Sequence, residues 1–331
     1  MRRIYLDNAA SAPLNKKVVK MLHKLGRLQG NPQGENGEAH WALNKMKWAR
    51  WQVACAIGCD EDEVFFCSGA TEANNLAKKL WKIKSDAKVH DSLTSDSKDY
   101  DVYAMSYINN ETGRFDGKGW LDNCYMFFDL TATIGHIRVD LHQWPQIVGA
   151  SFSGHKIGAL QGVGVLYIKK EEQKKLKRKL PKSPWSFGGG TPNVLGIYSL
   201  GIAIQDACNG RLMAKRNDKI ERMVFRIADA CAEMELRVEC NTHIVNITFK
   251  SVNGSLVTSI LAGKGIDISV GSACHSEDSE DTPSKILLEE GYTEEEALRT
   301  VRVSLSADNT MRDCKKFIKV LRKVIDNYDE M

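Results

Sequence analysis

The stretch VGASFSGHK, residues 148–156, decides the fold, and QGVGVLY follows it at residues 161–167. An apolar run of the strand type ends in small polar residues, His155 and Lys156 come next, and a turn at Gly158 leads into a second apolar strand. A lysine at the mouth of a sheet is poorly solvated, and desolvation favours its neutral amine. A Schiff-base lysine needs such an amine, although a surface lysine ending a strand fits this stretch equally well. The rest of the chain must decide between these interpretations.

Composition places the chain among ordinary globular proteins. With 331 residues, 43% hydrophobic and 27% charged, it is long enough for one large and one smaller domain with a substantial core. A formal charge of +4 is too small to indicate nucleic-acid binding, so we expect no direct nucleic-acid partner. The N-terminus shows no signal-peptide pattern, and no apolar run approaches membrane-spanning length, so we expect no membrane association.

The nine cysteines are odd in number and scattered, which indicates reduced thiols and predicts a cytoplasmic protein. Cys55 and Cys59 lie four residues apart, but no second pair of metal ligands accompanies them. Helix packing accounts for this pair better than zinc does, and we expect no metal site.

The stretch SGATEANN, residues 68–75, follows directly on the expected buried strand 64–67 and opens a helix expected over 72–81. The N–H groups at a helix start, the helix dipole and the Thr71 hydroxyl favour an anion at one spot. Small residues such as Ala70 let a phosphate approach closely, although the turn could also serve packing alone. We favour phosphate binding.

Strands, turns and helices alternate through the first two hundred residues, which predicts an α/β fold with a doubly wound, mostly parallel sheet. In such sheets ligands bind at the carboxyl ends of the strands. Thr71, Asn110, Asp129 and Lys156 each follow an apolar strand, so we expect all four at this edge. A buried carboxylate such as Asp129 is costly without a partner, which supports a binding site there.

The remainder of the chain predicts a small α+β domain. Its expected strands and helices lie over 243–249, 266–270, 211–234 and 311–328. We set the large domain at 11–205 and assign 1–10 and 206–331 to the small domain. Between these regions, the lysine-rich segment 169–184 lacks interleaved aromatic residues and is interpreted as solvated surface.

Two side chains of the second region are candidates for chemistry. Cys274 lies in GSACHS, residues 271–276, ahead of an acidic loop, where its thiolate could be a nucleophile or the residue could be structural. Arg302 lies inside the short apolar strand VRVSL, residues 301–305. A buried arginine needs a carboxylate, either from a neighbour or from a substrate.

Together these blocks resemble the cysteine desulfurases, pyridoxal-phosphate enzymes of the class V aminotransferase group. The matching blocks are YLD at 5–7, SGATE at 68–72, NNETG at 109–113, SGHK at 153–156 and GSAC at 271–274. With Arg302 they cover nearly the whole chain. The resemblance implies the PLP-dependent transferase fold type I, with a large doubly wound, mostly parallel sheet domain plus a small α+β domain.

The resemblance also implies a cofactor, pyridoxal 5'-phosphate, and residues that bind it. Lys156 would carry the cofactor through its amine, Asp129 would pair with the ring nitrogen, and His90 would stack on the ring as a further catalytic group. The cofactor phosphate would be held by Ala70, Thr71, Ser153 and His155, with Thr191 reaching in from a partner subunit.

The substrate implied by the resemblance is L-cysteine, which would be converted to L-alanine. Its binding residues would be Asn31, Asn110 and Arg302, and Asn110 would also contact the cofactor ring. Cys274 would attack the substrate sulfur and hold it as a persulfide. A sulfur-acceptor protein, either an iron–sulfur scaffold or a tRNA-thiolation protein, would then receive it from the expected homodimer.

The chain departs from the family pattern in ways that keep alternatives open. Ala132 stands where the family has a glutamine that bonds the ring oxygen, and the segments near 90–100 and 190 are shorter. Losing that partner should slow the chemistry without abolishing cofactor binding. The alternatives are a selenocysteine lyase, another β-lyase or aminotransferase on the same fold, and a catalytically impaired scaffold protein.

Overall fold

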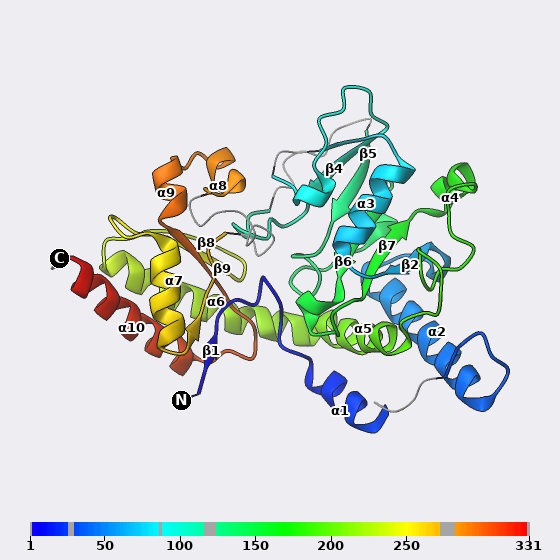
Figure 1. Ribbon diagram of the computed structural model, residues 1–331, viewed down its shortest axis with the longest axis horizontal. Helices are drawn as coiled ribbons and strands as arrows, with labels where there is room; N and C mark the ends of the chain where they lie inside the picture. Colours follow the sequence, from blue (N-terminus) through cyan, green and yellow to red (C-terminus); the bar gives the residue numbers. More distant parts are fainter. Residues whose placement is uncertain (1, 26–29, 86–87, 116–123, 272–281, 330–331) are drawn as a thin grey trace. The chain divides into compact units, whose positions relative to one another are not determined.

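The computed structural model describes residues 2–25, 30–85, 88–115, 124–271 and 282–329 (Figure 1). The chain divides into two compact units, which are described separately. The large unit consists of Pro13–Ile108 and Asp116–Met213, and the small unit of Met1–Ala12, Asn109–Phe115 and Ala214–Met331. Each unit contains its own cluster of buried apolar side chains. The domain boundaries expected from the sequence, 11–205 for the large domain and 1–10 with 206–331 for the small domain, stay a prediction.

The large unit is built on one sheet, whose described strands follow the order β2-β7-β6-β5-β4-β3 (Figure 1). These strands are β2 (Val64–Cys67), β3 (Ile83–Ser85), β4 (Val102–Ser106), β5 (Tyr125–Asp129), β6 (Ile147–Ser153) and β7 (Gly164–Ile168). Strands β3 to β6 run parallel, and β7 is antiparallel to both β6 and β2. The predicted α/β class with a mostly parallel sheet is therefore confirmed. Strand β7 reverses because the connection from β6 is too short for a crossover.

Helices pack against this sheet and against one another. Their bounds are α1 (Lys16–Leu25), α2 (Gly37–Ile57), α3 (Ala70–Leu80), α4 (Lys170–Leu176) and α5 (Val194–Ala207). Helix α3 contacts β6 and β7, and α2 packs along α5. The Asn36 side chain caps α2 by accepting a hydrogen bond from the Ala39 N–H, and Gly58, with a φ of +63°, ends the helix.

The small unit combines an antiparallel sheet of order β11-β9-β8 with the parallel pair β1-β10. Its strands are β1 (Ile4–Tyr5), β8 (Arg237–Asn241), β9 (Ile244–Thr248), β10 (Ile266–Asp267) and β11 (Thr300–Ser304). Its helices are α7 (Gly254–Gly263), α8 (Lys285–Glu289), α9 (Glu294–Leu298) and α10 (Met311–Asp329), with α6 (Gly210–Glu233) beginning in the large unit. No described helix is long and apolar enough to cross a membrane.

The segment Asn109–Phe115 belongs to the small unit although it directly follows the large unit's residues up to Ile108. The Asn241 amide donates to Thr112 O at 3.2 Å, and Arg114 pairs with Glu239 at 2.7 Å and with Glu290. A Cβ at Gly113, whose φ is +68°, would lie 2.6 Å from the Asn241 carbonyl oxygen. The segment therefore needs glycine at this position to lie against β8.

Candidate functional site

Asp129 is the last residue of β5, and it is buried at the carboxyl end of that strand. The Asn74 amide donates to Asp129 Oδ2 at 3.0 Å, and the backbone N–H of Thr131 donates to Oδ1 at 2.9 Å. These donors satisfy both carboxylate oxygens and fix the plane of the carboxyl group. The expectation that this aspartate has a partner is met by Asn74, which the sequence reasoning had not singled out.

Asn74 lies on the buried face of α3 and has no exposed surface. Besides Asp129, it contacts Ser151 on β6, whose hydroxyl donates to Asn74 Oδ1 at 2.5 Å, and Ser92, whose Oγ accepts from Asn74 Nδ2 at 3.0 Å. The sequence held a signal for this residue, because position 74 falls on the same helix face as the alanines at 70, 73 and 77. A polar residue on such an apolar face requires buried partners.

His90 is connected to the same group of side chains. Its Nδ1 lies 2.8 Å from Ser92 Oγ and accepts the backbone N–H of Ser92 at 3.2 Å. The structure thus links two predicted site residues, His90 and Asp129, through Ser92 and Asn74.

The start of α3 meets the end of β6, as expected for an anion site. The Ala70 N–H donates to Ser153 Oγ at 2.8 Å, and the N-cap residue Gly69 has no side chain of its own. A Cβ on Gly164 of β7 would lie 2.5 Å from Gly69 Cα, so the turn is held tightly against the sheet. Thr71, in the first turn of α3, is exposed. A helix start with a nearby hydroxyl suits a phosphate group.

Lys156 lies in the 3-10 turn Gly154–Ile157, directly after β6. The turn ends at Gly158, whose φ of +83° is left-handed, and a Cβ there would lie 2.9 Å from Pro13 O. The Asn15 N–H also donates to Gly158 O at 2.9 Å. These contacts fix the half-buried Lys156 close to the strand end that carries Ser153.

His155 precedes the lysine and is also half-buried. Burial, and then the positive charge of Lys156, lower the pKa of His155 to about 4. The imidazole is therefore neutral near pH 7, so it can act as a hydrogen-bond donor but not as a cation toward an anion.

Asn31 and Thr191 both lie in exposed loops of the large unit. The Asn31 side chain accepts the backbone N–H of Gln33 at 3.1 Å. Near Thr191, Asn193 caps α5 through the Gly196 N–H at 2.9 Å and donates to Gly162 O at 3.0 Å. The described contacts do not bring either predicted residue to Asp129 or Lys156, so their roles stay predictions.

In the small unit, Arg302 is almost completely buried on β11. Its guanidinium donates to Asn110 O at 2.9 Å and to Asp7 Oδ1 at 3.0 Å. Asp7 is therefore the neighbouring carboxylate that a buried arginine requires. Arg302 Nε and the adjacent Asn246 Nδ2 have no hydrogen-bond partner among the described residues. A further acceptor, such as a carboxylate, would suit these donors.

Cys274 lies outside the described residues, so its candidacy rests on the sequence. Burial raises the pKa of Cys67 and Cys231 to about 12, and burial, followed by Asp313, raises that of Cys314 to about 11. Thiols of this kind stay protonated at neutral pH and are poor nucleophiles. These three buried cysteines are therefore not competitors for a nucleophilic role.

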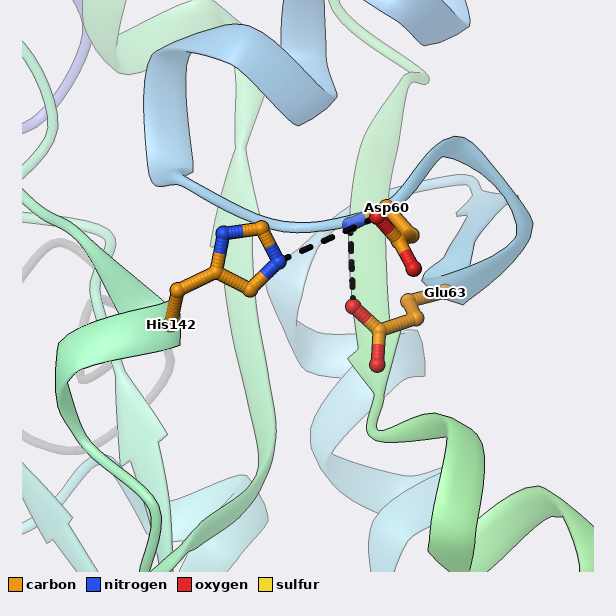
Figure 2. A group of neighbouring side chains, drawn as sticks. All are labelled: Asp60, Glu63 and His142. Carbon is orange, nitrogen blue, oxygen red and sulfur yellow. Dashed lines mark hydrogen bonds and ion pairs between the residues drawn. The ribbon is translucent and has the colours of Figure 1, made fainter.

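A separate group in the large unit consists of Asp60, Glu63 and His142, whose ligand atoms lie within 4.8 Å of one another (Figure 2). Glu63 accepts the backbone N–H groups of Asp60 at 3.0 Å and Lys170 at 2.8 Å. Asp60 and Glu63 form a capping box, in which Glu63 serves the start of a short helix. Because both Glu63 oxygens already accept backbone N–H groups, we assign Asp60 and Glu63 a capping role rather than metal binding.

Comparisons with known proteins agree with this architecture. The family model described as aminotransferase class-V matches residues 4–95 and 87–317. The chain is 26% identical to the cysteine desulfurase IscS of Methanosarcina thermophila over 396 residues, with 100% of this chain and 94% of that protein covered. Because 396 positions exceed the 331 residues here, the relative carries several dozen residues that this chain lacks.

Two solved structures share the fold. A NifS-like protein from Rickettsia africae superposes with a TM-score of 0.84 at 21% identity, covering 98% of this chain and 100% of that one. A structure described as SspA in complex with cysteine gives a TM-score of 0.72 at 23% identity, covering 93% and 100%. At these identities the likeness shows the fold alone.

The mostly parallel sheet defines an α/β protein whose fold is that of the NifS-like structure. The chain belongs to the class-V aminotransferase family. The resemblance to cysteine desulfurases drawn from the motifs is likewise confirmed by the relatives.

Proposed function

We propose that this protein is a pyridoxal-phosphate-dependent cysteine desulfurase that converts L-cysteine to L-alanine. The observation that carries the proposal is the carboxyl edge of the large sheet. There an amine (Lys156), a buried carboxylate (Asp129) and a helix start beside a hydroxyl (Ala70 and Ser153) all belong to one compact unit. This set of groups fits a phosphorylated carbonyl cofactor with a basic ring nitrogen.

Pyridoxal phosphate, when bound, supplies an electron sink for the bonds at the substrate Cα. Lys156 would hold the cofactor through its amine and, once released, would move the Cα proton. Asp129 would accept the ring N–H, and His90 would lie over the ring. Ala70, Thr71, Ser153, His155 and Thr191 would hold the phosphate.

Arg302 would bind the substrate carboxylate, and the buried Nε that has no partner among the described residues supports this role. Asn31 and Asn110 would complete the substrate contacts. The fold neighbour described as SspA in complex with cysteine supports cysteine as the substrate to test.

Cys274 would then take the sulfur atom. Its thiolate forms an S–S bond with the substrate sulfur while the substrate C–S bond breaks. The electron pair of the broken bond stays with the carbon skeleton, which gains a proton and leaves as alanine. The sulfur remains on Cys274 as a persulfide until an acceptor protein removes it. An iron–sulfur scaffold and a tRNA-thiolation protein are the acceptor classes to test, and a homodimer in the cytoplasm is the proposed setting.

Cys274→Ala tests the proposal at its sulfur-transfer step. The variant should take up pyridoxal phosphate with the absorption spectrum of the wild type but form no persulfide from L-cysteine. Mass spectrometry of the intact chain checks this as the loss of the one-sulfur adduct, with Cys55→Ala, a change at an exposed cysteine, as the control. A full persulfide yield in Cys274→Ala would contradict the assignment.

The main competing function is that of a cofactor-binding scaffold, which Ala132 favours because it removes a ring-oxygen partner. Spectral uptake of the cofactor without turnover of either L-cysteine or L-selenocysteine would support the scaffold. Turnover of L-selenocysteine alone would support a selenocysteine lyase. Exchange of amino groups with a keto acid would support an aminotransferase.

A further inference from the structure

The Asn74 side-chain amide forms hydrogen bonds with three side chains of the large unit. It has no exposed surface, and it contacts Asp129 on β5, Ser151 on β6 and Ser92 beside His90. We propose that Asn74 is a positioning residue that orients Asp129 and, through Ser92, sets the ring tautomer of His90. The effects on cofactor binding rest on the proposed function, whereas the orientation of Asp129 and the tautomer of His90 do not.

The orientation of the Asn74 amide follows from its partners. Nδ2 lies 3.0 Å from Asp129 Oδ2, and Oδ1 lies 2.5 Å from Ser151 Oγ. A flipped amide would bring its carbonyl oxygen against the Asp129 carboxylate, where neither atom can donate a hydrogen. Both Nδ2 hydrogens are therefore committed, one to Asp129 and one to Ser92 Oγ.

Asp129 receives a directed donor from this amide. Together with the Thr131 N–H, the amide holds both carboxylate oxygens in one plane. Without the amide, one carboxylate oxygen would lose its fixed donor, so Asp129 would be less precisely aimed at a protonated ring nitrogen.

The hydrogen bond from Asn74 to Ser92 bears on which ring nitrogen of His90 carries the proton. The backbone N–H of Ser92 donates to His90 Nδ1 at 3.2 Å, which favours the tautomer with Nδ1 unprotonated. Ser92 Oγ lies 2.8 Å from the same Nδ1, and in that tautomer its hydroxyl is the donor of the pair. Because Ser92 Oγ accepts from Asn74 Nδ2, its own hydrogen is left for the histidine. The chain of donors runs from Asn74 through Ser92 to His90, and the neutral ring then carries its proton on Nε2.

The first test needs no cofactor. Nitrogen-15 chemical shifts of His90, measured near pH 8 on the protein without pyridoxal phosphate, distinguish a protonated from an unprotonated ring nitrogen. We expect Nδ1 unprotonated and Nε2 protonated in the wild type. Ser92→Ala keeps the backbone N–H at 3.2 Å but loses the hydroxyl at 2.8 Å, so the share of the tautomer protonated on Nδ1 should rise. A wild-type ring with its proton on Nδ1, or an unchanged tautomer ratio in Ser92→Ala, would overturn the His90 branch.

The second test uses pyridoxal phosphate. Asn74→Ala should weaken cofactor binding by roughly tenfold or more, the effect expected for a lost bond to a charged group. It should also shift the pH midpoint of the visible cofactor band by about half a unit or more. Asn75→Ala is the matched control, because Asn75 is the exposed neighbour on the same helix. Equal cofactor affinity and equal midpoints in the two variants would overturn the Asp129 branch.

Thermal unfolding of each variant without cofactor accompanies both tests. If Asn74→Ala does not fold, Asn74→Asp replaces it. That change keeps the shape but puts a carboxylate against Asp129, and its midpoint must shift if the proposal holds. Failure of the wild type itself to bind pyridoxal phosphate would contradict the proposed function, while the His90 tautomer would still decide the positioning role.

Discussion

At the scale of single residues, His155 gives the clearest dependence on pH. Burial and Lys156 lower its pKa to about 4 from an ordinary value of 6.5. Between these values the unfolded chain binds more protons than the folded chain, so the free energy of unfolding falls as the pH is lowered from 6.5 towards 4. Above about pH 6.5 this loss is absent.

A histidine NMR titration of the protein without cofactor checks this prediction. The His155 ring should titrate near pH 4, and the signal is identified by its absence in His155→Gln. In Lys156→Ala the midpoint should rise, yet stay below 6.5, because burial is the larger cause. A wild-type midpoint at the ordinary value would contradict the described burial.

Some of the individual residues of the candidate site could be predicted from the sequence, and others could not. Asp129 and Lys156 were singled out because each comes at the end of an apolar run, and the direction of a strand fixes the edge at which its last residue lies; Ser153 was named only through the family resemblance. Asn74 was not assigned, because its partners Ser92 and Ser151 are distant in sequence and their contacts depend on the packing of α3. Asp7 as the partner of Arg302 was missed for the same reason, since 295 positions separate them.

At the scale of elements, the contact between β7 and the start of α3 is the most sensitive. A Cβ at Gly164 would lie 2.5 Å from Gly69 Cα and 2.9 Å from Phe152 O, and these backbone atoms cannot rotate away. Gly164→Ala should therefore lower the free energy of unfolding by about 1–3 kcal/mol. It should also weaken pyridoxal-phosphate binding, because the Gly69–Ala70 turn must move.

Denaturant unfolding and a cofactor titration check this prediction, with Gly37→Ala as the control. Gly37 is the first residue of α2, and no atom lies within 4 Å of a Cβ placed there. If Gly164→Ala matches Gly37→Ala in both stability and cofactor affinity, the tight contact between β7 and α3 is wrong.

The elements themselves were predictable where their pattern was strong. Strands β2 and β6 and helices α3, α6 and α10 lie within a few residues of their expected ranges, since they are apolar runs or amphipathic segments. Helix α5 was not anticipated, because VLGIYSLGIAIQDA is apolar on nearly every side and shows no helical period. Strand β3 and helices α8 and α9 are too short to give a pattern.

At the scale of the whole molecule, each unit has a main apolar core of its own, although the relative from Methanosarcina thermophila carries several dozen residues that this chain lacks. The core of the large unit and the core of the small unit each draw on residues distant in sequence. The sequence could predict the class of fold from its motifs, but not the assignment of Asn109–Phe115 to the small unit, which depends on contacts with β8.

The proposed homodimer is also a prediction at this scale. Light scattering on the eluting protein should give about twice the chain mass of 37.0 kDa. Dimers are expected because Thr191, exposed in its own unit, is proposed to serve the site of a partner subunit. A mass of one chain across micromolar concentrations would contradict this arrangement, and Thr191 would then lose its proposed role.

The most direct test of the central claim is the release of alanine from L-cysteine by the purified protein, with pyridoxal phosphate and a reductant supplied. Because each sulfur transferred leaves one carbon skeleton, we predict alanine and sulfide in equal amounts. Both should be lost in Lys156→Ala, while Lys169→Ala, a change at a lysine in the same unit just beyond β7, should keep them. No alanine from folded protein that has taken up the cofactor would contradict the claim that this chain is a cysteine desulfurase.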